Sequence, residues 1–331
     1  MWWRFIRIKL PLFFLPLAFA GKWQLTPKQW RTIAFSFILL VFLACCWSLW
    51  KYFENIQVIN KGYLRAKVIP TPLENDHVRF SLVVCTAIIC SALLIRDFIQ
   101  KNVKILLVFF IVLFTIYLHI LSARTGLICL YIFFVLYFFY LLVSLKKIKW
   151  VIALSIAILL MPVASWFFLP TFQNRIRYII YDFSYLKKEI YLPGSNDGNR
   201  MLSLKAGYEI LKENPLGVGC GDLINETNLW YRKYIPGMLE SDKYFPSSEW
   251  LMYGGTAGWP GIFLFTLIMI IPFFQKNMAR RFFWFSLNTI AVLSFLFDIG
   301  LEVQFGVFIY AFTVLWWWKW LHKEFNAGIT Q

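Results

Sequence analysis

Three arginines stand where polar and apolar segments meet, which is where a charged ligand could be held at the edge of a membrane. Arg124 lies between two apolar runs, Arg79 directly precedes another, and Arg200 lies at the predicted start of a helix in a polar stretch. The planar guanidinium makes paired, charge-assisted hydrogen bonds, and a helix N-terminus also attracts anions, so these residues suit a diphosphate. Arginine also snorkels at helix ends, and for Arg124 and Arg79 that interpretation stays open.

A second group, Glu74, Asp76 and His77, has side chains that could bind Mn²⁺ or Mg²⁺. The same residues follow Pro70 and Pro72 and would also suit a solvated turn. Because the arginines already supply positive charge for a diphosphate, we expect no metal and no other cofactor.

Glu302 lies at the predicted outer end of the last apolar segment. A carboxylate so close to hydrocarbon is costly unless it is paired. We therefore expect an arginine partner and a structural role, with contact to an acceptor as the alternative. Gly217, Gly219 and Gly221 form GxGxG, but no strand precedes them and no Gly-Lys-Ser/Thr follows, so they predict a tight turn rather than a nucleotide site.

The elements that must position these residues are membrane helices. Hydrophobic residues make up 60% of the 331 and charged residues 15%, far from the composition of an ordinary soluble domain. Several windows hold the roughly 20 apolar residues that a helix needs to cross a bilayer. We predict an all-α integral membrane protein, a polytopic bundle of eight or nine transmembrane helices. The net charge of +16 reflects topology and an anionic ligand better than nucleic acid.

The predicted spans set the topology. An N-terminal segment at 8–20 is a short span or an interfacial segment, and further spans are expected near 31–50, 80–98, 103–121, 127–145, 149–169, 250–274, 282–298 and 303–321. Lys and Arg gather in alternate short connections, which should be cytoplasmic. The whole chain, 1–331, then forms one membrane domain, and residues 171–248 form one large, partly helical loop on the opposite, extracytoplasmic face.

Within this loop, Asn196 or Asp197 is predicted to cap a helix that runs to about Glu213, before Pro215 and the glycine-rich turn. Apolar residues recur at helical spacing and should pack this helix on the membrane bundle; they are Met201, Leu204, Tyr208 and Leu211.

Five segments, in this order, resemble the O-antigen ligase family of bacterial inner membranes. They are SARTG (122–126), Asn-Arg at 199–200, NPLGVG (214–219), PSSEWLMYGGTAGWPGIFLF (246–265) and LEVQFG (301–306). The segment KVIPTPLENDHVRFSL (67–82) looks like the Bacteroidetes form of that family. The resemblance covers essentially the whole chain, and the order of the motifs is more specific than any one of them.

The resemblance implies a membrane-embedded, metal-independent glycosyltransferase. It moves a glycan from an undecaprenyl-diphosphate carrier to an acceptor such as the lipid A core, on the periplasmic face of the inner membrane. By position, Arg124 and Arg200 match the family's two diphosphate-contacting arginines. An apolar groove between spans would hold the polyprenyl tail among the membrane lipids.

One departure concerns the general base. Many family members have His-Asn after the proline that opens the segment beyond the large loop, whereas Pro246 here is followed by Ser247, Ser248 and Glu249. A base must lie within hydrogen-bond reach of the acceptor hydroxyl. Glu249, at the outer edge of a span, and His77 are the candidates, and Ser247 is an acceptor-side candidate; without a dedicated base, stabilisation of the leaving group by cations would carry the reaction.

These observations favour inverting glycosyl transfer of the O-antigen ligase kind. An O-antigen polymerase and a protein O-oligosaccharyltransferase would use the same donor and differ only in the acceptor. A transporter of lipid-linked glycan is the alternative from another class. Transporters place ionisable residues near the midplane, whereas here polar residues gather toward one face, which favours interfacial chemistry.

Overall fold

The computed structural model describes residues 2–21, 25–65, 67–72, 76–98, 100–188, 190–276, 278 and 280–322. The chain divides into two compact units, which we describe separately. The loop unit comprises Met1–Pro16, Ile176–Lys276 and Ala291–Ala311. The bundle unit comprises Leu17–Arg175, Asn277–Ile290 and Phe312–Gln331. Three helices continue from one unit into the other: α1 (Trp2–Ala20), α8 (Pro170–Leu186) and α12 (Arg281–Phe297).

The bundle unit is built around helix α4 (His77–Asp97). Helices α2 (Pro27–Glu54), α5 (Lys101–Leu121) and α6 (Arg124–Phe139, extended by the π-turn Tyr140–Ser144) pack directly on it. α7 (Ile148–Phe168) packs on α5 and α6, while α3 (Ile56–Gly62) and the 3₁₀ turn Tyr63–Arg65 follow α2. α4 is apolar around nearly its whole circumference, so it is buried on most sides.

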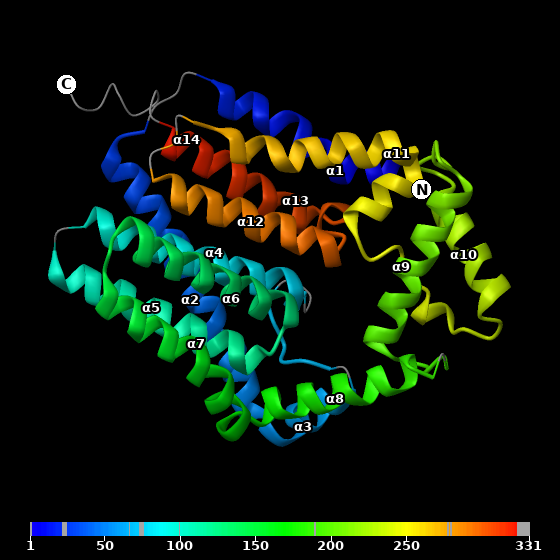
Figure 1. Ribbon diagram of the computed structural model, residues 1–331, viewed down its shortest axis with the longest axis horizontal. Coiled ribbons are helices and arrows are strands. Elements are labelled where there is room, and N and C mark those ends of the chain that lie inside the picture. Colours follow the sequence, from blue (N-terminus) through cyan, green and yellow to red (C-terminus); the bar gives the residue numbers. More distant parts are fainter. Residues whose placement is uncertain are drawn as a thin grey trace. The chain divides into compact units, whose positions relative to one another are not determined.

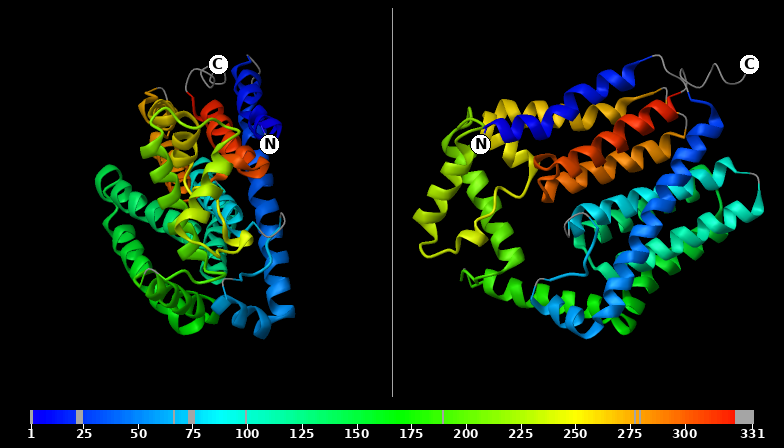
Figure 2. Two further views of the ribbon diagram at one scale, coloured as in Figure 1. Left: turned by 90° about the vertical axis from the view of Figure 1, so that its right-hand side faces the viewer. Right: turned by 180° about the vertical axis from the view of Figure 1, so that it is seen from behind.

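The loop unit is built around helix α9 (Asn196–Glu213), which packs on α10 (Leu223–Tyr234) and on α11 (Glu249–Ile270) (Figures 1 and 2). Short 3₁₀ turns occupy Glu240–Asp242, Ile271–Phe274 and Gly300–Glu302. The last of these leads into α13 (Gln304–Ala311), after which a π-turn (Phe312–Trp316) and α14 (Trp317–Leu321) belong to the bundle unit.

Helix α11 is broken at Gly258, where φ is 67° and ψ is −157°. The glycine-rich turn after α9 fills the break: Val218 N–H donates to the Gly255 carbonyl (2.8 Å), and Trp259 N–H donates to the Pro215 carbonyl (3.0 Å). A broken helix in a membrane protein must have its released backbone groups satisfied by protein. The tight turn predicted from GxGxG is present, with Gly217 at φ 83°. Its backbone supplies hydrogen-bond partners for groups that the break in α11 releases.

The helical, membrane-embedded class is confirmed. Six described helices are long and apolar enough to cross a membrane. They are α2, α4, α5 and α7 by themselves, and α6 and α11 together with the turns that follow them. Eight or nine spans were predicted. The segment at 281–297 forms an apolar helix of 17 residues, and 303–321 is divided among α13, a π-turn and α14.

Two local predictions for α9 are wrong. Its N-cap is Ser195, whose hydroxyl accepts from Gly198 N–H at 2.8 Å, rather than Asn196 or Asp197. The predicted apolar stripe is not the buried face either, because Met201 and Tyr208 are exposed. The buried face instead carries Ile210 and Leu211 together with three small residues, Ser203, Ala206 and Gly207. Small side chains allow α9 to approach its neighbours closely, and a hydrophobicity pattern does not detect them.

Candidate active site

A lysine and a carboxylate from opposite ends of the chain meet in the loop unit. Lys9 Nζ, on α1, lies 2.6 Å from Glu302 Oε1, and the side chains are 29% and 7% exposed. The ammonium also lies 4.5 Å from the centre of the Tyr253 ring, on α11. The prediction that Glu302 pairs with an arginine is therefore wrong about the cation, although the carboxylate is paired. A charge on α1 satisfies it, 293 residues away in the sequence.

Glu249, the first residue of α11, is fully buried beside this ion pair. Its Oε1 accepts a hydrogen bond of 2.5 Å from Leu301 N–H, in the 3₁₀ turn that also contains Glu302. Its Oε2 has no hydrogen-bond partner among the described residues. In this arrangement the Glu249 carboxylate fixes the Gly300–Glu302 turn. A general base must contact the acceptor hydroxyl, so action as a base requires exposure of this carboxylate.

Arg200 lies in the second turn of α9 and is partly exposed. One Nη1 hydrogen bond of 3.3 Å reaches the carbonyl oxygen of Phe297, at the end of α12. The start of α9 is fixed by Asp182 on α8, which accepts from the Ser195 hydroxyl through one oxygen and from Asp197 N–H (2.9 Å) through the other. The position of Arg200 is thus set by a capping network.

Ser247 ties α9 to the segment before α11. Its hydroxyl lies 2.8 Å from the Ser203 hydroxyl, which also accepts from Ser247 N–H at 3.2 Å. One turn further along α9, a Cβ at Gly207 would lie 2.7 Å from Pro246 Cβ. Ser247 is thus held next to Ser203, which lies within one turn of Arg200 along α9. The Ser247 side chain contributes to packing and hydrogen bonding there.

Asp242 organises the rest of the loop. It accepts hydrogen bonds from the Tyr191 hydroxyl (2.6 Å) and from Gly194 N–H (2.7 Å). Burial alone would raise the pKa of Asp242, but these hydrogen bonds outweigh it and hold the pKa below its ordinary value. The carboxylate thereby fastens the segment before α9 to the segment after α10.

The other predicted site residues belong to the bundle unit. Arg79 Nη1 lies 2.6 Å from Asp76 Oδ2, and Asp76 also caps α4 by accepting from Arg79 N–H at 3.2 Å. His77, the first residue of α4, is partly exposed. Arg79 is thus already held by a neighbouring carboxylate, which makes it a helix-end residue as well as a candidate ligand.

Arg124 is the first residue of α6 and is partly exposed. The turn before it requires Ser122 in the left-handed region, at φ 50°. Just inside α6, a Cβ at Gly126 would lie 2.4 Å from Ser81 Cβ, so the first turns of α4 and α6 are in close contact. The structure therefore brings Arg124 to the same end of the bundle unit as His77 and Arg79.

Of the alternative metal site, Asp76 and His77 are described, while Glu74 lies outside the described residues. Across the described ranges, no group of three or more His, Cys, Asp or Glu residues could hold a metal ion.

Sequence reasoning missed three residues that shape the loop unit: Lys9, Asp182 and Asp242. Lys9 had a detectable signal, because a charge within an apolar segment needs a partner. The two aspartates had none, because a carboxylate that receives backbone N–H groups from distant segments looks locally like any polar loop residue.

The family model of the O-antigen ligases matches residues 107–266. The match includes Arg124, Arg200, Ser247 and Glu249, whereas His77, Arg79 and Glu302 lie outside it. No curated protein matched the chain. The order of the motifs, the helical membrane architecture and this match all support the O-antigen ligase family, for which glycosyl transfer of the ligase or polymerase type is the implied activity.

Proposed function

We propose that the protein transfers a glycan from an undecaprenyl-diphosphate carrier to an acceptor, with the lipid A core as the first candidate, at the periplasmic face of a bacterial inner membrane. The observation that carries this proposal is the family match over 107–266, because it includes both Arg124 and Arg200. These are the two arginines that the motif resemblance assigns to the diphosphate.

Arg200 is the best supported diphosphate contact. Its described hydrogen bond uses one N–H of a guanidinium that has five donors, and the side chain is partly exposed. Arg124, at the N-terminus of α6, adds its charge to a helix end that already favours anions. Arg79 is assigned to the same ligand, secondary to its ion pair with Asp76.

The proposed reaction is a direct displacement. The acceptor hydroxyl oxygen attacks the anomeric carbon, the bond from that carbon to the diphosphate oxygen breaks, and the electron pair leaves with the diphosphate. The arginines stabilise the charge that develops there, so no metal is required. The hydroxyl proton passes to a base, and His77 and Glu249 both stay predictions for that role.

Lysine substitutions test the role of the arginines, because lysine keeps the charge and removes the planar fork. A lost charge-assisted hydrogen bond costs about 1.5–3 kcal/mol, so Arg124→Lys and Arg200→Lys should each lower transfer about 10- to 150-fold. The assay uses purified protein, a diphosphate-linked glycan donor and lipid A-core. Arg232→Lys, on the exposed surface of α10, is the matched control and should transfer normally.

Normal transfer by both Arg124→Lys and Arg200→Lys would refute the diphosphate assignment. The acceptor is tested separately, by offering lipid A-core, a lipid-linked glycan and a protein in parallel. Transfer only to lipid-linked glycan would identify a polymerase, and transfer only to protein would identify a protein O-oligosaccharyltransferase.

A further inference from the structure

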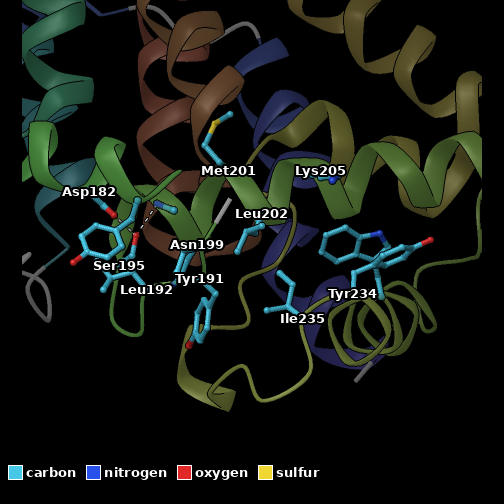
Figure 3. A pocket seen from close by; sticks show the side chains of 14 residues that line it. Asp182, Tyr191, Leu192, Ser195, Asn199, Met201, Leu202, Lys205, Tyr234 and Ile235 are labelled. Carbon is cyan, nitrogen blue, oxygen red and sulfur yellow. Dashed lines mark hydrogen bonds between the residues drawn. The ribbon is translucent and has the colours of Figure 1, made fainter. Parts of the chain in front are cut away.

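The loop unit contains a cavity of ≈ 450 Å³ between the end of α8, one face of α9 and α10 (Figure 3). We call it the loop pocket, and its characteristic side chains are Tyr191, Asn199, Leu202, Lys205, Trp230 and Tyr234. Its volume lies within the roughly 300–1,000 Å³ of ordinary small-molecule sites, and its lining is mainly apolar and aromatic with a few polar groups, as in such sites.

The loop pocket and Arg200 lie on opposite faces of α9. Gly198, Leu202 and Lys205 line the pocket, and their spacing of four and three residues places them on one face of the helix. Arg200 is two residues from Gly198, about 200° around the helix. The Arg200 face is the one on which Ser203 and Gly207 contact the segment before α11. One helix diameter, roughly 10–12 Å, therefore separates the loop pocket from the Arg200 side.

Aromatic rings in the loop pocket are held in fixed orientations. The Trp230 indole N–H donates to Glu209 at 2.6 Å, and the Tyr191 hydroxyl donates to Asp242. The Trp230 and Tyr234 rings have their centroids 5.0 Å apart, and 48% of Tyr234 is exposed. Rings whose polar atoms are already bonded present their apolar faces to a ligand. Such faces suit the C–H surface of a pyranose ring.

Polar groups accompany these rings. Asn199 is fully buried and lines the loop pocket. Neither its amide nitrogen nor its amide oxygen makes a hydrogen bond of normal geometry with a described residue, although its amide lies near enough to Asp242 to help lower the pKa of that carboxyl. Lys205 is exposed and adds a mobile ammonium. An amide and an ammonium supply the donors and the acceptor that sugar hydroxyls need.

We propose that the loop pocket binds a sugar residue of the donor glycan, beyond the sugar that reacts. This proposal rests on the proposed function, in which Arg200 holds the diphosphate next to the reacting sugar. A glycan that leaves that position can pass around α9 and reach the loop pocket within a few sugars. A polyprenyl tail would leave the buried Asn199 amide without a hydrogen-bond partner, and so fits the pocket less well.

The first experiment compares two donors with the full-length protein: a carrier diphosphate with one sugar and the same carrier with a chain of several sugars. Tyr234→Ala and Lys205→Ala should lower kcat/KM for the long donor, about 10-fold for Tyr234→Ala, mainly through KM. Both should stay within about twofold of the unsubstituted protein on the short donor. Tyr208→Ala is the matched control, since Tyr208 is an exposed tyrosine of α9 that does not line the pocket.

An equal loss on both donors, or no loss on either, would overturn the pocket assignment. A second measurement separates it from the proposed function: binding of the labelled, purified protein to an array of defined oligosaccharides. The unsubstituted protein and Tyr208→Ala should bind, and Tyr234→Ala and Lys205→Ala should not. Binding without transfer would reject the proposed function and keep the pocket. Absence of binding by the unsubstituted protein, or equal binding by all variants, would reject the pocket.

Discussion

Replacing Lys9 by methionine should destabilise the protein more than replacing Glu302 by glutamine, although the two residues form one ion pair. Lys9→Met leaves the Glu302 carboxylate charged, with its side chain 7% exposed and the buried Glu249 nearby. Glu302→Gln leaves an ammonium whose side chain is 29% exposed and lies over the Tyr253 ring. The asymmetry follows from which charge can still reach solvent.

The magnitudes follow from the same exposures. Breaking a buried pair by removing one partner costs about 3–5 kcal/mol, which is the expectation for Lys9→Met. For Glu302→Gln the lost charge-assisted hydrogen bond costs about 1.5–3 kcal/mol. The double variant leaves no buried charge at this pair, so its cost should fall below the sum of the two, with a coupling energy of about 0.5–3 kcal/mol.

Thermal unfolding of the purified protein in detergent, followed by tryptophan fluorescence, measures these differences. At about 2–4 °C per kcal/mol, Lys9→Met should lower Tm by about 6 °C or more. Lys212→Met, an exposed position on α9, is the matched control and should shift Tm by less than about 2 °C. A Glu302→Gln variant less stable than Lys9→Met, or a double variant with fully additive cost, would refute the reasoning.

Three further predictions concern the break in α11, the acid stability of the loop and the absence of a metal. Gly258→Ala should lower the free energy of unfolding by at least about 2–3 kcal/mol, because its Cβ would lie 2.0 Å from the Pro215 carbonyl oxygen at φ +67°. A Cβ at Gly221 would have nothing within 4 Å, so Gly221→Ala should be neutral. Equal Tm values for the two variants would contradict this. Because the folded pKa of Asp242 is lowered, its stabilisation is present above the unfolded pKa of about 3.9 and is lost as pH falls through the lower folded pKa. Limited proteolysis of the loop should therefore accelerate in that acid range, and an Asp242→Asn variant with the same pH dependence would contradict the assignment. Transfer should survive EDTA, and a loss restored by Mn²⁺ or Mg²⁺ would show that a cation takes part.

The spans were the most predictable part of the fold. Long apolar runs specify a membrane helix by themselves, since lipid leaves the backbone few other conformations, and the runs beginning near 80, 103 and 127 became α4, α5 and α6. The last apolar run was less informative. Hydropathy reports how much apolar sequence is present, but not whether the backbone keeps regular α-helical hydrogen bonding, and here a π-turn at Phe312–Trp316 divides it.

The candidate site was predictable only where its signal is local. The N-cap of α9 was misassigned because the Ser195 hydroxyl is held in place by a hydrogen bond to the carboxylate of Asp182, on another helix. The buried face of α9 was misassigned because Gly207 packs by being small. The partner of Glu302 was assigned the wrong residue type because Lys9 is 293 positions away. Each miss depends on a contact between distant segments, which no local pattern contains.

The position of α9 determines how activity data on this protein should be interpreted. Asp182 fixes the start of the helix, and Ser203 and Gly207 fix its approach to the segment before α11. Because α9 carries Arg200 on one face and the loop pocket on the other, a shift of the helix would move both. A substitution at Asp182 that lowers transfer from short and long donors alike would therefore indicate a positioning role. A residue that contacts only the distal glycan should instead affect the long donor alone.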